Sequence, residues 1–180
     1  MHRYALSAIG RDRPGIVAGI TRLLLEHGLN IEDSQATILR GHFSIVLIVA
    51  APDGLDLNRF AGELDQEAER LGLSAIDVTP VENAGQSAEP THMVSVYGGD
   101  HPGIVHAATQ ALADRRIDIT DLNTRLLEDE EGDEEPLYAL MMEVALPSGV
   151  SAEVLEGDLA AVGERQGVEV TLHELEDDVL

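Results

Sequence analysis

The sequence predicts an α+β protein made of two tandem copies of one βαββαβ domain, each with a four-stranded antiparallel sheet. Two observations support this prediction: the 180-residue chain matches itself at a nearly constant offset, and each half alternates short apolar runs with two segments of helical periodicity. The length suits one ordinary domain or two small ones. Because 44% of the residues are hydrophobic but only 3% are aromatic, aliphatic side chains must form the cores.

The internal repeat fixes the domain organisation. An offset of 88 residues places residues 14–17 on 102–105, both Pro-Gly-Ile-Val, and an offset of 95 later places Glu69-Arg70-x-Gly72 on Glu164-Arg165-x-Gly167. The change of offset coincides with an acidic run at 128–135 in the second half.

A small, polar segment without periodicity separates the copies, as is typical of a linker. We therefore predict a first domain at 1–82, a linker at 83–91 and a second domain at 92–180.

The first copy opens with a strand and a helix. Residues 4–9 form a short apolar run bounded by Gly10, which is typical of a strand. The next helix is predicted to have Asp12 as its N-cap and Pro14 in its first turn, because aliphatic residues then recur on one helical face. Gly28 is expected to end this helix.

The rest of the first copy predicts a hairpin, a helix and a final strand. Two runs, 34–40 and 43–50, flank a Gly-His pair and indicate a β-hairpin. Apolar residues at helical spacing then predict a helix over 57–71, which a glycine ends before a strand at 73–81.

The second copy repeats this order. We expect strands at 93–97, 119–127, 137–146 and 168–175, and helices at 102–115 and 151–166. With right-handed crossovers, each copy closes into a ferredoxin-like fold with both helices on one face of the sheet. The strands at 45–49 and 140–142 are nevertheless apolar on both faces, so we expect a partner, internal or in a second chain, to cover the other face.

The net charge of the chain argues against two classes of binding partner. It carries 34 acidic and 11 basic residues, for a net charge of −23 at pH 7. Such a surface repels nucleic acid and anionic membranes. No apolar run approaches the roughly 20 residues of a spanning helix, and residues 1–6 do not lead into a signal-peptide core. We therefore expect a cytoplasmic protein.

A repeated loop precedes the first helix of each copy and could bind an anion. Residues 10–15 and 98–103 share the pattern Gly-x-Asp-x-Pro-Gly before a helix N-terminus, where unpaired amides and the positive end of the dipole favour an anion. The carboxylate of a free amino acid would suit this position, and Gly15 and Gly103 would allow close approach. The same pattern is also an ordinary helix start, and common descent of the two copies also explains its repetition.

The first loop and the end of its helix, Gly10-Arg11-Asp12-Arg13-Pro14-Gly15-Ile16-Val17 and Gly28-Leu29-Asn30-Ile31, resemble the signature of ACT domains. Each of the two copies resembles an ACT domain, so the resemblance covers essentially the whole chain. It implies small regulatory modules of βαββαβ form that bind amino acids at interfaces between paired domains. A stand-alone tandem pair further resembles the glycine-cleavage-system transcriptional repressor-like group, which implies action through a partner protein.

The resemblance also implies a set of ligand-binding residues. In the first copy these are Gly10, Arg11, Asp12, Arg13, Pro14, Gly15, Ile16, Asn30 and Ile31, and in the second copy Asp100, His101, Pro102, Gly103, Ile104 and Asp118. The copies differ where Asp118 replaces the neutral Asn30, and where the titratable His101 replaces the permanent cation Arg13. We predict that the first loop is the better anion site.

Catalysis and metal binding find no support in the sequence. There is no cysteine, no nucleophile elbow, no P-loop and no dinucleotide fingerprint, and the seven histidines show no metal-ligand spacing. The acidic run at 128–135 lacks the alternating ligands of an EF-hand and predicts a solvated, mobile hairpin tip. We expect no cofactor, no metal and no enzymatic activity.

Two functional hypotheses follow. The first is a non-enzymatic sensor that binds a small amino acid, with glycine as one candidate, at a domain interface and acts through a partner protein as a homodimer or higher homo-oligomer. The alternative is a constitutive interaction module whose ligand loops are vestigial.

Overall fold

The structure is a computed structural model that describes residues 2–81, 88–127 and 136–175. The chain divides into two compact units, Met1–Gly85 and Gln86–Leu180, called unit 1 and unit 2 below. Of the predicted linker, residues 83–87 lie outside the described residues. Thr91, its last residue, hydrogen-bonds through its backbone to Val144 and Leu175 of unit 2.

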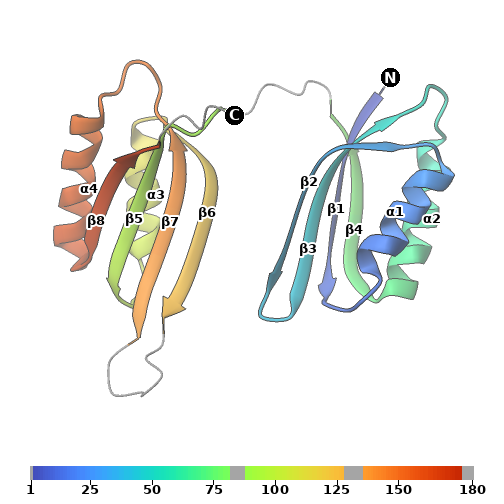
Figure 1. Cartoon of the computed structure of the whole chain (residues 1–180), viewed down its shortest axis with the longest axis horizontal. Helices are drawn as coiled ribbons and strands as arrows, with labels where there is room; N and C mark the ends of the chain where they lie inside the picture. Colours follow the sequence, from blue (N-terminus) through green and yellow to red (C-terminus); the bar gives the residue numbers. More distant parts are fainter. Residues whose placement is uncertain (1, 82–87, 128–135, 176–180) are drawn as a thin grey trace. The chain divides into compact units, whose positions relative to one another are not determined.

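Unit 1 has the predicted βαββαβ order. Its elements are β1 (His2–Arg11), α1 (Ile16–Glu26), β2 (Asn30–Leu39), β3 (His42–Ala51), α2 (Leu57–Leu71) and β4 (Leu73–Pro80). The strands form one antiparallel sheet in the order β2-β3-β1-β4, and both helices cover the same face of it (Figure 1). The predicted hairpin is confirmed as the β2–β3 pair.

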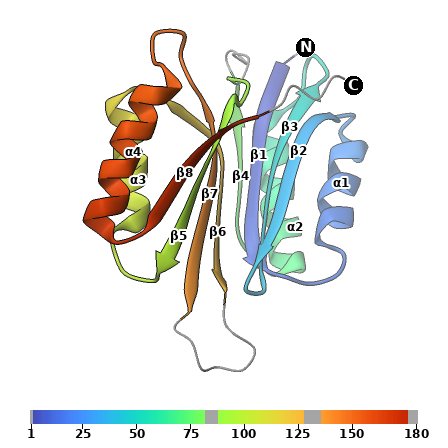
Figure 2. The same cartoon turned by 60° about the vertical axis from the view of Figure 1, so that its left-hand side comes forward.

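Unit 2 repeats this architecture. Its elements are β5 (His92–Gly99), α3 (Ile104–Asp114), β6 (Asp118–Leu127), β7 (Leu137–Ala145), α4 (Ala152–Gln166) and β8 (Glu169–Glu174). The sheet order is β6-β7-β5-β8, and α3 and α4 lie on one face of the sheet (Figure 2). The tandem ferredoxin-like fold predicted from the repeat is therefore confirmed. The acidic run that joins β6 to β7 lies outside the described residues.

The predicted start of α1 is wrong. The N-cap is Gly15, with φ of 97° and no side-chain cap, and the backbone N–H of Asp12 instead donates to the carbonyl of Gly41 at 2.8 Å. The chain turns through a left-handed conformation at Gly15, so Asp12 lies too far upstream to reach the first-turn amides, and Pro14 precedes the helix. In unit 2, α3 likewise begins after Gly103, whose φ is 109°.

The second strand of unit 1 is longer than predicted. β2 begins at Asn30, not near Ser34, because an irregularity between Ile31 and Asp33 lets pairing with β3 continue past a register shift. The other predicted element ends differ from the observed ones by a few residues.

Each unit has its own aliphatic core between its helices and its sheet. In unit 1 the fully buried side chains include Leu6, Ile20, Leu24, Leu47, Phe60 and Leu64. In unit 2 they include Val94, Val96, Leu112, Leu140, Met142 and Leu155. Alternation along the strands and 3.6-residue spacing along the helices bring these residues to one side of each element.

The sheet face of unit 1 that lies away from its helices carries apolar side chains. Ile9 in β1 is 47% exposed, and Val46 in β3 is 48% exposed. The strand β2 lies at the edge of the sheet, where Ile38 and Leu39 are also exposed. The expectation that a partner covers this face stays a prediction. No helix in the described parts of the chain is long and apolar enough to cross a membrane.

Candidate functional site in the repeated loops

The two repeated loops lie on the surface, each between the first strand of a unit and the helix that follows. Residues 11–15 are all exposed, and so are residues 99–103. The first amides of α1 and α3 have no partner within their helices, because a helix leaves its first N–H groups unpaired. These amides and the dipole can hold an anionic group.

The glycines of the loop have two different roles. A Cβ added at Gly15 would meet nothing within 4 Å, so its positive φ is what requires glycine there. A Cβ at Gly10 would lie 2.8 Å from the Cα of Leu73, and one at Gly98 would lie 2.5 Å from a methyl group of Val168. Gly10 and Gly98 therefore allow the first and last strands of each sheet to pack closely, which is a structural role.

The side chains of Arg13 and His101 lie against the end of the second helix of their unit. The guanidinium of Arg13 covers Gly72, the C-cap of α2, where an added Cβ would lie 2.7 Å from Nη1. The Nε2 atom of His101 lies 2.7 Å from the carbonyl oxygen of Gln166, the last residue of α4. A cation is favourable at this end of a helix, where the dipole is negative.

His101 has a second carbonyl neighbour. Its Nδ1 atom lies 3.2 Å from the carbonyl oxygen of Pro102. The hydrogen bonds to Gln166 and Pro102 raise the pKa of His101 above its ordinary value, and Asp100 adds a smaller effect in the same direction. The imidazolium is therefore the form that this position favours.

Asn30 lies at the other end of the sheet from the loop of its own unit. Asn30 pairs with Ala50, which pairs with Arg3 at the start of β1, whereas the loop follows Arg11 at the end of β1. Eight residues of strand separate these ends, or about 27 Å at about 3.4 Å per residue. Figure 1 shows the β1–α1 loop and the start of β2 at opposite ends of unit 1.

Unit 2 has the same separation. Asp118 pairs with Ala145, next to the pair of Val144 with His92 at the start of β5, whereas Gly99 at the end of β5 pairs with Leu137. The structure thus brings the loop residues together within each unit, but it does not bring Asn30 or Asp118 to them there. Ile31 lies beside Asn30 on β2 and is 37% exposed. Ile16 is buried at the start of α1, next to the loop.

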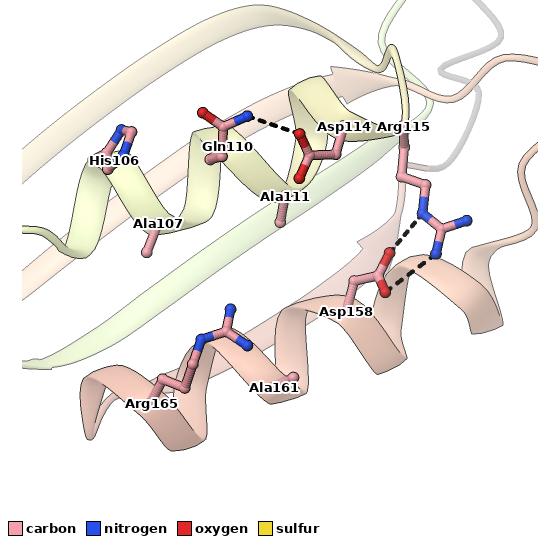
Figure 3. Close-up of a pocket in the computed structure, with 9 residues that line it drawn as sticks. All are labelled: His106, Ala107, Gln110, Ala111, Asp114, Arg115, Asp158, Ala161 and Arg165. Carbon is pink, nitrogen blue, oxygen red and sulfur yellow. Dashed lines mark hydrogen bonds and ion pairs between the residues drawn. The ribbon is translucent and has the colours of Figure 1, made fainter.

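A groove between α3 and α4 is a second candidate, and sequence reasoning missed it (Figure 3). Its volume is about 430 Å³, and it is lined by His106, Ala107, Gln110, Ala111, Asp114, Arg115, Asp158, Ala161 and Arg165. Ala107 and Ala111 point from α3 toward α4, and an ion pair of Arg115 with Asp158, at 2.7 Å, bridges the two helices at one end. The small side chains leave the space that forms the groove.

The corresponding helices of unit 1 carry a charged network at this place. Glu67 is only 7% exposed, and its carboxylate accepts from Arg70 at 2.8 Å and pairs with Arg22 at 3.2 Å. These arginines, Arg70 foremost, lower the pKa of Glu67 despite its burial. Gly19 makes room for it, since a Cβ there would lie 2.6 Å from Glu67 Oε1.

Unit 2 has lost the acid of this network and kept one base. At the two repeat offsets, Val162 corresponds to Glu67, Gln110 to Arg22 and Arg165 to Arg70. None of the described residues forms an ion pair with Arg165. The pair Arg115–Asp158, in contrast, matches His27–Glu63 of unit 1 in position, with His27 Nε2 2.8 Å from Glu63 Oε2. Aligning the two copies at these offsets shows the substitutions. Only the structure shows that the substituted residues of unit 1 contact one another.

Within the described residues, no group of three or more His, Asp or Glu side chains is placed to hold a metal ion. The first amides of α1 and α3 could hold the anionic group of a small ligand.

Comparison with known proteins supports the prediction that unit 1 is an ACT domain. A sequence profile of the ACT domain family matches residues 3–78. The UPF0237 protein of Methanopyrus kandleri is 42% identical over 77 residues, which span 42% of this chain and 86% of that protein. The UPF0237 protein of Methanocaldococcus jannaschii is 38% identical over 77 residues, again 86% of its length.

Two solved structures share the tandem arrangement of the whole chain. The crystal structure of a protein from Galdieria sulphuraria has a TM-score of 0.82 and 25% identity, covering 97% of this chain and 99% of its own. A candidate glycine cleavage system transcriptional repressor has a TM-score of 0.72 and 20% identity, covering 98% of both chains, which is a likeness of fold. The UPF0237 relatives show the family of the chain: it belongs to the UPF0237 proteins, and its residues 3–78 match the ACT domain.

Proposed function

We propose that this protein is a non-enzymatic sensor that binds a small amino acid at its repeated loops and acts through a partner protein. The observation that carries the proposal is the exposed loop with a left-handed glycine, Gly15 or Gly103, directly before a helix N-terminus in each unit. The first amides of the helix would hold the carboxylate of the ligand. The ACT family supports a regulatory role.

A complete site would need two ACT units. The loop of a unit and its Asn30 lie at opposite ends of one sheet, so both can contact one small ligand only if the loop comes from one unit and the start of β2 from another. The resemblance to ACT domains implies such a site between paired domains. Binding would then favour one arrangement of the units over others, which is the requirement for a ligand-dependent switch.

A structural neighbour suggests the first ligand to test, and the net charge suggests the route of action. Glycine is the first ligand to test, because a candidate glycine cleavage system repressor shares the tandem fold. The net charge of −23 opposes direct contact with nucleic acid, so a regulatory signal would pass through another protein.

A thermal-unfolding screen against the twenty amino acids tests the proposal. A ligand that binds only the folded protein, at 100 times its Kd, adds about 2.7 kcal/mol to the free energy of unfolding. We expect one amino acid or a small group to raise Tm in this way, and acetate at the same concentration to serve as a matched carboxylate control without the ammonium group.

The alternative function is a constitutive interaction module. The exposed Ile38 and Leu39 on the edge strand β2 favour it, since an apolar sheet edge can pair with another chain. An unchanged Tm with all twenty amino acids, together with stable self-association, would select this alternative and overturn the sensor.

A further inference from the structure

Both units hold a basic side chain of the ligand loop against the C-terminus of the second helix. The two residues correspond at the offset of 88, and each lies at the C-terminal end of the second helix of its unit, Arg13 over Gly72 and His101 on the carbonyl of Gln166. A shared contact between a loop and a distant helix end indicates a role in holding the loop.

Both ring nitrogens of His101 face carbonyl oxygens. Nε2 faces the carbonyl oxygen of Gln166 at 2.7 Å, and Nδ1 faces that of Pro102 at 3.2 Å. A carbonyl oxygen can only accept a hydrogen bond, and a neutral imidazole carries one N–H. Only the imidazolium can therefore make both contacts, whereas a guanidinium at the position of Arg13 keeps its charge at every relevant pH.

The charged neighbours of His101 are on two elements. Asp100, on the same loop, favours the imidazolium. Glu164 and Arg165 lie in the last turn of α4, next to Gln166 in the sequence, and carry charges of opposite sign. The two carbonyl oxygens are the larger influence on the pKa of His101, ahead of Asp100.

We propose that Arg13 and His101 are positioning residues that clamp the ligand loops to the second helix of each unit, and that only the second loop loosens when His101 loses its proton. The consequence for ligand binding rests on the proposed function. The consequence for the loops does not, because the clamp is a contact within each unit. At low pH both loops are held fully. At high pH the first loop is unchanged, whereas neutral His101 keeps at most one of its two hydrogen bonds and loses its charge at the helix C-terminus, so that the second loop is held less firmly.

Amide hydrogen exchange measured by NMR on the full chain without ligand tests the clamp. We would follow the backbone amides of residues 12–16 and 100–104, apart from the two prolines, from pH 5.5 to 8.5, corrected for intrinsic exchange, and titrate the His101 ring in the same samples. The second loop should lose protection about two- to fivefold as His101 deprotonates, as expected for a charge at a helix C-terminus, while the first loop stays constant.

Exchanging the two side chains sharpens the test. His101→Arg should make protection of the second loop independent of pH, and Arg13→His should transfer the pH dependence to the first loop. His173→Gln is a matched control, because His173 is an exposed histidine on β8 that pairs with Met93, at the other end of β5 from the loop, and should leave both profiles unchanged. Protection of the second loop that stays flat through the His101 titration, or an unaltered pH profile in His101→Arg, would overturn the clamp.

The same variants separate this inference from the proposed function. With glycine as the probe, wild type should lose affinity at the second loop as His101 deprotonates, and His101→Arg should restore that affinity. Exchange that follows His101 with no glycine binding at any pH would retain the clamp and count against glycine as the ligand. Glycine binding with flat exchange would overturn the clamp and retain the sensor.

Discussion

Unit 1 and unit 2 have the same sheet order and the same helix positions, yet they hold their helices together differently. Unit 1 places the buried carboxylate of Glu67 between Arg22 and Arg70, whereas unit 2 has Val162 at that position and an open groove beside it. Apolar periodicity and glycines at strand contacts are common to both. The comparison indicates that the fold depends on the core pattern and that the polar contacts between helices can change without changing it.

The largest expected effect comes from placing the acid of unit 1 into unit 2. Val162→Glu should lower the free energy of unfolding by about 3 to 5 kcal/mol, because Val162 is 1% exposed and the new carboxylate would lack a counterpart of Arg22, one of the two bases that pair with Glu67. Urea denaturation measures the change.

Two further substitutions complete that exchange. Adding Gln110→Arg supplies the missing base, and Ala107→Gly restores the space that Gly19 provides in unit 1. The triple variant should recover most of the lost stability. If it is no more stable than Val162→Glu alone, the networks of the two units are not equivalent.

A smaller effect is expected at Gly19. Gly19→Ala should cost about 1 to 3 kcal/mol, because the added methyl would lie 2.6 Å from Glu67 Oε1 and 2.9 Å from Leu71 Cδ1. Gly62→Ala in α2 is the control: it meets nothing within 4 Å and should stabilise the helix by up to about 1 kcal/mol. Equal signs for the two variants in thermal unfolding would argue against the close approach at Gly19.

The ends of the first helices give a reciprocal prediction of about 1 kcal/mol. Gly28 follows α1 with φ of 70°, and Arg116 takes the same place after α3 with φ of 56°. Since a left-handed conformation costs a non-glycine residue roughly 1 to 2 kcal/mol, Arg116→Gly should stabilise unit 2 and Gly28→Ala should destabilise unit 1. Opposite shifts of Tm are the expected result, and a loss of stability in both variants would contradict it.

The pH dependence of unit 1 is the subtlest prediction, because many other carboxylates titrate with Glu67. Its folded-state pKa lies below the ordinary value, chiefly through Arg70, so its contribution is present above the unfolded-state pKa and is lost as the pH falls through the folded-state pKa. Denaturation curves between pH 3 and 7 should therefore fall less steeply with acid in Glu67→Gln than in wild type. Parallel curves would show that Glu67 gains nothing from its arginines.

Much of the fold was predictable because it rests on local patterns. The apolar run of β3, the helical spacing in α2 and the terminal Gly72 and Gly28 are visible in the sequence, and the structure confirms these elements. Asp12 misled the prediction because a capping residue type does not reveal whether the backbone reverses at the next glycine. Here the left-handed turn at Gly15 starts the helix later.

The candidate site was less predictable because its contacts are distant in sequence. His101 and Gln166 are 65 residues apart, so their contact depends on how α4 packs in the finished unit. The motif placed Arg13 and His101 in the loops, but it could not show that their side chains reach a helix end. Nor could it show that Asn30 begins β2 at the far end of the sheet from the loop of its own unit.

Isothermal titration of the amino acid selected by the screen tests the central proposal most directly, in wild type and in two variants. Gly15→Ala alters the loop, and Asn30→Ala alters the residue about 27 Å away in the same unit, counted as eight strand residues; circular dichroism checks that both fold. If one ligand bridges two units, each variant should raise Kd by about tenfold or more, the loss expected for one hydrogen bond to a charged group. An unchanged Kd in both variants would contradict the account.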